Sequence, residues 1–195
     1  MVQPAMADPV ALYEAARANL LPALAGVKPG QLDDGTPCTE WNVQQLMVHN
    51  IKVAEFFFRV ITEDSRADRL SMFEVDGPLP IEGIEAAFVT ITNRIINAAR
   101  APGALETVVN TGLGEALLAR VLGAPITDMT LHKWDLAKAT GQDTTIDSSL
   151  AEVCYHNLAQ VVEGARERGT FGGDVSVPMS ASIQEKLLGL SDRQP

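Results

Sequence analysis

The chain has few of the residues that typify a disulfide-stabilised protein. Only two cysteines occur among 195 residues, Cys38 and Cys154; they lie far apart and form no CxxC motif. Two isolated thiols are typical of a reducing compartment rather than of a secreted disulfide framework. We therefore expect a cytoplasmic protein with free thiols.

Positive charge and long apolar runs are also scarce. Lys and Arg number 15 against 25 Asp and Glu, so the formal net charge is −10, and the basic residues form no run. Such a surface repels the nucleic-acid backbone and anionic lipids. Charges interrupt every apolar stretch before it reaches about 18 residues, the length that a membrane-spanning helix needs. Residues 1–9 lack the basic and apolar regions of a signal peptide. We expect no nucleic-acid partner and no membrane partner.

The remaining composition is that of an ordinary globular protein. Hydrophobic residues make up 46% and charged residues 21% of the chain, which excludes a disordered or collagen-like protein. A chain of this length forms one domain in most proteins. We expect a single domain over residues 1–195, with a core at about 9–168 and a C-terminal tail at 171–195.

Apolar residues recur at helical spacing along most of the chain. Asp8, Asn42 and Asp147 precede such segments and are placed to cap helices, and Pro22 can kink the first helix. The expected helices cover about 10–25, 43–61, 81–100, 126–139 and 148–168, with short helical pieces at 115–122 and near 183–190.

Between the helices, residues 28–40 and 64–80 are expected to be loops. The stretch 104–114 is ambiguous, because Thr107-Val108-Val109 fits either a short strand or an extended loop, and Gly123-Ala124-Pro125 is expected to break the helical pattern. No alternation of period two repeats along the chain. The sequence predicts an all-α four-helix bundle whose long connections include crossovers or site-forming loops.

Three of the polar residues have the types and spacing of metal ligands. Asp128 and His132 are four residues apart, so that on a helix they project from one face. A carboxylate with an imidazole suits a divalent ion such as Zn²⁺, Ni²⁺ or Fe²⁺. His49, on the inner side of the second helix, would bring the count to three, which is that of a catalytic zinc site with an open position. The alternatives are a surface Asp–His pair and a hydrogen-bonded core histidine.

Other reactive or aromatic side chains have simpler interpretations. His156 is interpreted as a structural histidine. Core packing is favoured for Trp41 and Trp134 over lining a ligand pocket. Cys38 has no basic partner nearby in the sequence, which favours packing at the start of the second helix over a nucleophilic role.

The motifs around these residues resemble a known family. The segment 36–43, leading to Leu46 and His49, resembles the second-helix segment of DinB-like metal-binding proteins. It is most similar to the branch that contains the N-terminal domain of mycothiol-dependent maleylpyruvate isomerase. The segment 128–141 resembles the second signature of that branch, and 187–195 resembles its terminal motif.

The resemblance implies a DinB-like bundle of up-down-down-up order with a metal on the inner helix faces. It implies His49, Asp128 and His132 as ligands and a mycothiol-like thiol as partner. The branch usually has Glu where this chain has Asp128, which is shorter by one methylene, and Lys133 occupies a position that is often small. The second domain of the isomerase has no counterpart in this sequence, so the resemblance does not extend to its substrate.

Three functions are compatible with these features. The first is a divalent-metal enzyme, with zinc favoured over nickel or iron, that delivers a small-molecule thiol to an electrophile for transfer or isomerisation. The second is a metal-dependent hydrolase. The third is a non-catalytic binding or structural protein with a degenerate metal site, which the replacement at Asp128 favours. A homodimer is compatible with all three, because such bundles often pair through helix faces.

Overall fold

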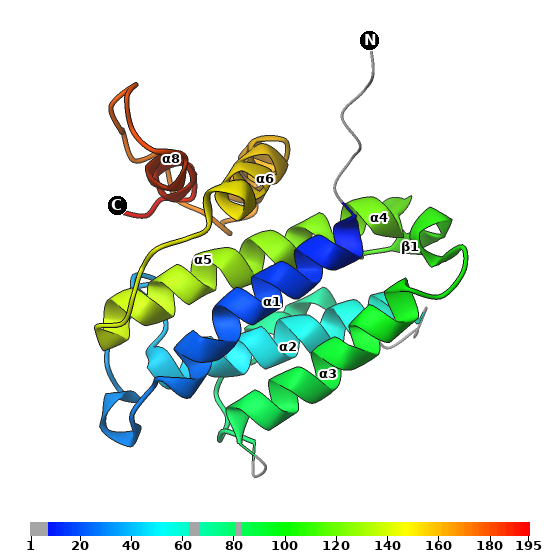
Figure 1. Ribbon diagram of the computed structural model, residues 1–195, viewed down its shortest axis with the longest axis horizontal. Helices are drawn as coiled ribbons and strands as arrows, with labels where there is room; N and C mark the ends of the chain where they lie inside the picture. The colour runs from blue at the N-terminus through cyan, green and yellow to red at the C-terminus, as the bar shows by residue number, and fades with distance from the viewer. Residues whose placement is uncertain (1–7, 63–66, 81–82) are drawn as a thin grey trace.

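Four long helices form the bundle that the sequence predicts. The computed structural model describes residues 8–62, 67–80 and 83–195. α1 packs against α5 and α3, and α2 packs against the same two helices, so α1 and α2 lie at opposite corners (Figure 1). α2 and α3 run in one direction, and α1 and α5 run in the other (Figure 1). The bundle helices are α1 (Pro9–Ala25), α2 (Val43–Ile61), α3 (Ile84–Ala99) and α5 (Gly123–Thr140).

Local capping explains where several helices begin and end. The Asn42 side chain accepts a hydrogen bond from the Gln45 backbone N–H at 2.9 Å, and the Gln45 side chain accepts one from the Asn42 backbone at 3.0 Å. This reciprocal capping box satisfies two N–H groups that the first turn of α2 leaves free. Asp8 caps α1 in the predicted manner, and α1 continues through Pro22 to Ala25. Gly141 ends α5 with a φ of 72°, in the left-handed region that glycine tolerates.

The connections between the bundle helices are long, as the sequence predicts, and contain short elements. η1 (Pro29–Gln31) lies between α1 and α2, and η2 (Arg69–Phe73) lies in the predicted loop 64–80 and packs against α2. Residues 63–66, and 81–82 at the expected start of the third helix, lie outside the described residues. The path from α3 to α5 contains η3 (Ala104–Glu106), β1 (Val108–Asn110), β2 (Glu115–Leu117) and α4 (Leu118–Val121).

The prediction of one helix at 115–122 is wrong. Residues 115–117 form β2, which pairs antiparallel with β1, and only 118–121 are helical. The segment Glu-Ala-Leu favours a helix by propensity, but the hairpin supplies a backbone partner that overrides it. The predicted break at Gly123–Pro125 is also wrong, because α5 begins at Gly123. Pro125 falls in the first turn, where a missing N–H costs little.

The predicted long helix at 148–168 is divided in two. It consists of α6 (Ser148–Ala159), capped by Asp147, and α7 (Val162–Glu167). The N–H groups of Gln160 and Val161 bond to carbonyls three residues back, which tightens and ends α6, and two adjacent valines favour helix continuation poorly. α8 (Ile183–Leu190) packs on α6, and α6 packs on α5, so these helices form a second layer outside the bundle (Figure 1).

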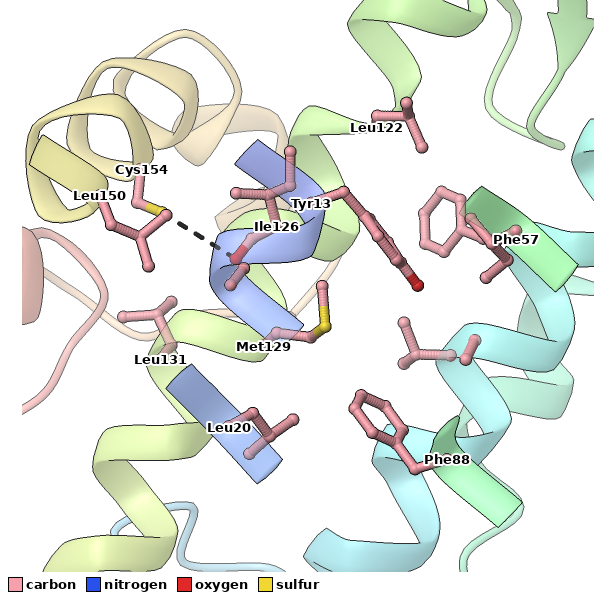
Figure 2. Close-up of a cluster of buried hydrophobic side chains, with 14 of the residues drawn as sticks. Tyr13, Leu20, Phe57, Phe88, Leu122, Ile126, Met129, Leu131, Leu150 and Cys154 are labelled. Atoms are coloured by element: carbon pink, nitrogen blue, oxygen red, sulfur yellow. Dashed lines mark hydrogen bonds between the residues drawn. The ribbon is translucent and has the colours of Figure 1, made fainter. Parts of the chain in front are cut away.

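The core joins both layers. Figure 2 shows Tyr13 and Leu20 of α1 facing Phe57 of α2 and Phe88 of α3. Leu150 and Cys154 of α6 lie on the outer side of α5, near Ile126 (Figure 2), and the Cys154 thiol is 3.9 Å from the Ile126 carbonyl oxygen. Leu187 and Leu188 of α8 are buried in the same cluster. Among the described residues, no helix has the length and apolar character needed to cross a bilayer.

Candidate metal centre

The three predicted ligand residues meet where α2 faces α5. His49 lies in α2, and Asp128 and His132 lie one turn apart on α5. Nε2 of His49 is 3.5 Å and Nε2 of His132 is 3.4 Å from the same carboxylate oxygen, Oδ1 of Asp128. One donor atom from each residue lies within 4.8 Å of the other two. Two imidazoles and one carboxylate thus converge on a common point.

The second nitrogen of each imidazole is already engaged. Nδ1 of His49 is 2.8 Å from the backbone carbonyl oxygen of Met72 in η2, and Nδ1 of His132 is 3.0 Å from Oδ2 of Asp135. Carbonyl and carboxylate oxygens only accept hydrogen bonds, so both Nδ1 atoms carry the hydrogen. This arrangement orients each Nε2 toward Asp128, as is usual for metal-ligating histidines.

The charges of these residues favour a cation between them. Burial works to raise the pKa of the Asp128 carboxyl, but the His132 and His49 imidazoles outweigh it and hold the pKa well below its usual range. Burial works to lower the pKa of His132, but the charge of Asp128 outweighs it and raises that pKa well above its usual value. A proton on His132 would supply positive charge beside Asp128, and a metal ion bound there would take the place of that proton.

A further observation is consistent with a metal ion at this place. Oδ2 of Asp128 is buried and has no hydrogen-bond partner among the residues that the structure describes. A buried carboxylate oxygen without a donor is costly, and a bound cation would satisfy it. The donor set of two imidazole nitrogens and a carboxylate suits Zn²⁺ and related divalent ions.

Two aromatic side chains lie against the imidazoles. The Trp41 ring centroid is 4.3 Å from that of His49 and 6.0 Å from that of His132. Phe73 of η2, which is partly exposed, has its ring 6.0 Å from His49. Core packing, predicted for both tryptophans, describes Trp134, which is 3% exposed. Trp41, just before the cap of α2, also packs against the core while partly buried, and in addition it lies beside two of the candidate ligands.

A second cluster, which sequence reasoning missed, lies on the other side of His132. It consists of Cys38, Asp135 and Arg193. The Cys38 thiol donates to Oδ2 of Asp135 at 3.2 Å and lies 3.8 Å from Nδ1 of His132. Arg193, close to the C-terminus, bonds both Asp135 oxygens, through Nε at 2.8 Å and Nη2 at 2.7 Å. The spacing of His132 and Asp135 on one helix could have indicated this contact, but Arg193 is 58 residues from Asp135 and has no local signal.

Cys38 and Asp135 of this second cluster also form, together with His132, a group of three potential metal ligands. The positive charge beside this group is already supplied by the guanidinium of Arg193. Cys38, His132 and Asp135 offer donor atoms within 4.8 Å of one another. The guanidinium of Arg193 occupies both oxygens of Asp135 and also lies 3.4 Å from the Cys38 sulfur. The group of His49, Asp128 and His132 is therefore the candidate metal centre.

The other residues considered from the sequence lie away from this centre. His156 is exposed on α6, next to Tyr155. Lys133 is buried and points away from the imidazoles, since its ammonium donates to the carbonyls of Asp143 and Thr145 at 2.7 Å each. Burial lowers the pKa of Lys133. Its hydrogen bonds fasten the loop after α5, which is a structural role.

Several known proteins are similar to this chain, in sequence or in fold. Two uncharacterized proteins of Mycobacterium tuberculosis, Rv0738 and MT0763, are each 30% identical to this chain over 144 residues. These residues are 74% of this chain and 74% of the relative. The crystal structure of a histidine-to-alanine mutant of the mycothiol-dependent maleylpyruvate isomerase has the same fold, with a TM-score of 0.66 and 15% sequence identity over 85% of this chain and 72% of that chain. The family described as the mycothiol maleylpyruvate isomerase N-terminal domain matches residues 13–137, and this chain belongs to that family.

Proposed function

We propose that this protein binds one divalent metal ion through His49, Asp128 and His132 and uses it to activate a low-molecular-weight thiol of the mycothiol kind. The observation that carries the proposal is the convergence of two Nε2 atoms on Oδ1 of Asp128, at 3.5 and 3.4 Å. Zinc is the favoured ion, with nickel and iron as alternatives, because the donor set is borderline in softness. The thiol would react with a small electrophile, by transfer or by isomerisation.

The residues of the chain have separate parts in this proposal. When bound, a divalent ion lowers the pKa of a thiol that contacts it, so that thiolate is available near neutral pH. His49, Asp128 and His132 hold the ion, and the Met72 carbonyl and Asp135 keep the two imidazoles in one orientation. Trp41 lies against both imidazoles, and Phe73 lies against that of His49.

The thiol comes from outside the chain in this proposal. Cys154 is fully buried in the core, and burial raises the pKa of its thiol. Cys38 lies behind His132, where its sulfur contacts Nδ1 rather than the Nε2 that faces Asp128. Neither cysteine is therefore placed to react at the candidate metal centre.

The first test is the metal content. The protein is purified without a histidine tag and analysed by elemental mass spectrometry beside His132→Ala and His156→Ala variants. We expect about one ion per chain in the wild type, loss of the ion in His132→Ala, and no change in His156→Ala, whose imidazole is exposed on α6. Absence of stoichiometric metal even after reconstitution would overturn the proposal and leave a family member with a degenerate site.

The second test is the reaction. The metal-loaded protein is incubated with mycothiol and a panel of electrophiles, and free thiol is measured over time. Loss of thiol that needs the electrophile, the metal and His132 supports the proposal. Hydrolysis of an ester or amide without any thiol would instead identify a metal-dependent hydrolase.

A further inference from the structure

Arg193 follows α8, and only the side chain of Asp135 lies between it and the candidate ligand His132. Arg193 is 6% exposed, and its partner Asp135 on α5 is fully buried. We propose that Arg193 is a positioning residue: it holds the Asp135 carboxylate so that Asp135 orients His132, whose Nε2 then faces Asp128. The consequence for metal binding rests on the proposed function, whereas the orientation of His132 does not.

The contact between Arg193 and Asp135 has the geometry of a rigid clamp. Nε of Arg193 bonds Oδ1 of Asp135 at 2.8 Å, and Nη2 bonds Oδ2 at 2.7 Å. Two parallel bonds from a planar guanidinium fix the plane of a carboxylate, which a single point charge does not. Rotation of the Asp135 side chain would break both bonds in a buried place, where neither group could turn to water instead.

The clamped oxygen is also the one that contacts the imidazole. Oδ2 of Asp135 is 3.0 Å from Nδ1 of His132, and it accepts from the Cys38 thiol as well. Because the guanidinium supplies the counter-charge, Asp135 needs no proton and remains a pure acceptor toward His132. Without Arg193, no other charged donor would hold the Asp135 carboxylate in this plane, and the orientation of the imidazole would no longer be determined.

Arg193 is itself held in place by the backbone around it. Its N–H donates to the carbonyl of Leu188 at 2.9 Å, and its Nη1 donates to the carbonyl of Ser191 at 2.7 Å. Asp192 has a φ of 63°, the left-handed conformation that turns the chain back sharply after α8. The Asp192 side chain accepts from the N–H of Gly172. These contacts direct the guanidinium inward rather than toward solvent.

A role limited to fastening the C-terminal segment is the competing explanation, and the chain offers a control for it. Arg166 of α7 also binds this segment, through the carbonyls of Leu190 at 2.9 Å and Gly172 at 2.9 Å, and forms an ion pair with Asp174. None of its hydrogen bonds reaches Asp135 or His132. Arg166→Met therefore loosens the segment without removing the clamp.

The test compares the full-length wild type with Arg193→Met, Arg193→Lys and Arg166→Met. The affinity for Zn²⁺ is measured at pH 8 by competition with a chromophoric chelator, and the visible spectrum of the Co²⁺-loaded protein is recorded. We expect Arg193→Met to bind Zn²⁺ about 10- to 100-fold more weakly and to change the Co²⁺ spectrum, as is usual when the residue that orients a ligand is lost. Arg193→Lys should recover part of the affinity, and Arg166→Met should keep it.

A second measurement needs no metal. In protein labelled with ¹⁵N at histidine, the Nδ1–H signal of His132 should be sharp and protected in the wild type and in Arg166→Met, and lost in Arg193→Met. If the wild type binds no Zn²⁺, the proposed function fails and this signal alone decides the positioning role. An unchanged signal in a folded Arg193→Met protein, with a melting temperature lowered as in Arg166→Met, would show that Arg193 only fastens the segment.

Discussion

The buried carboxylate of Asp135 accepts hydrogen bonds from three other residues, which come from three separate parts of the chain. His132 lies one turn before it on α5, Cys38 precedes α2, and Arg193 follows α8. Burial works to raise the pKa of Asp135, but the charge of Arg193 and the hydrogen bonds from His132 and Arg193 outweigh it and lower the pKa to about 2. A single side chain thus joins the candidate ligand to both the loop before α2 and the C-terminal segment.

This lowered pKa predicts a specific sensitivity to acid. Because the folded pKa lies below the usual value of 3.8, the ionised Asp135 stabilises the fold above about pH 4, and the contribution is lost as the pH falls toward 2. Between pH 5 and pH 3 we expect the metal-free wild type to lose about 1 kcal/mol more stability than Asp135→Asn, whose side chain does not titrate. Urea unfolding at the two pH values measures the difference, and equal losses in the two proteins would contradict it.

Helix α8 shows how a short element depends on its surroundings. It has eight residues, too few to be stable alone, and its capping box at Ser182 and Glu185 only sets its start. Leu187 and Leu188 bury its inner face, and the carbonyl of Gly189 accepts a hydrogen bond from the N–H of Val175 at 2.9 Å. The position of this helix in turn determines where Arg193 reaches.

Gly189 is the position in α8 that tolerates no side chain. A Cβ there would lie 2.6 Å from the carbonyl oxygen of Val175 and 3.1 Å from Cγ1 of Val177. We expect Gly189→Ala to lower the free energy of unfolding by about 1–3 kcal/mol, as overpacking usually does. Gly173→Ala is the control, because nothing lies within 4 Å of its Cβ. Similar unfolding curves for the two variants would show that α8 is less closely packed than its contacts indicate.

At the scale of the whole molecule, the candidate metal centre joins two helices that are not consecutive. His49 comes from α2 and the other two residues from α5, with α3 between them in the chain. The centre thus links elements that the chain brings together only after a long crossover. An ion bound there would stabilise the folded state relative to the unfolded chain.

Removal of metal is therefore expected to lower the melting temperature. Zn²⁺ at about 100 times its dissociation constant should stabilise the fold by about 2.7 kcal/mol relative to protein in a chelator. Differential scanning calorimetry with and without chelator measures the shift. Asp128→Asn should reduce the shift strongly, and His156→Ala should retain it. A melting temperature insensitive to both zinc and chelator would count against the site.

The elements best predicted from sequence are those whose signals are local. α2 has both a capping box at Asn42 and a long helical repeat of apolar residues, and its predicted bounds are those observed. The sequence does not predict β2, because a three-residue strand is defined by its partner, β1, and not by its own propensity. The predicted helix at 148–168 runs past the end of α6 at Ala159, since the residues around Gln160 include no glycine or proline to mark that end.

The sequence alone determined the all-α class, the main helices and the placing of Asp128 and His132 on one helix face, because these depend on spacing and capping within a few residues. The inner position of His49 on the second helix made it a candidate for the third ligand, and the resemblance to a known family implied the same three residues. Only the tertiary structure brought His49 to the other two and set Trp41 against them. It alone joined Arg193 to Asp135, since a contact between residues 58 positions apart depends on which helices pack together. The apolar period shows which face of a helix is buried but not which element covers it.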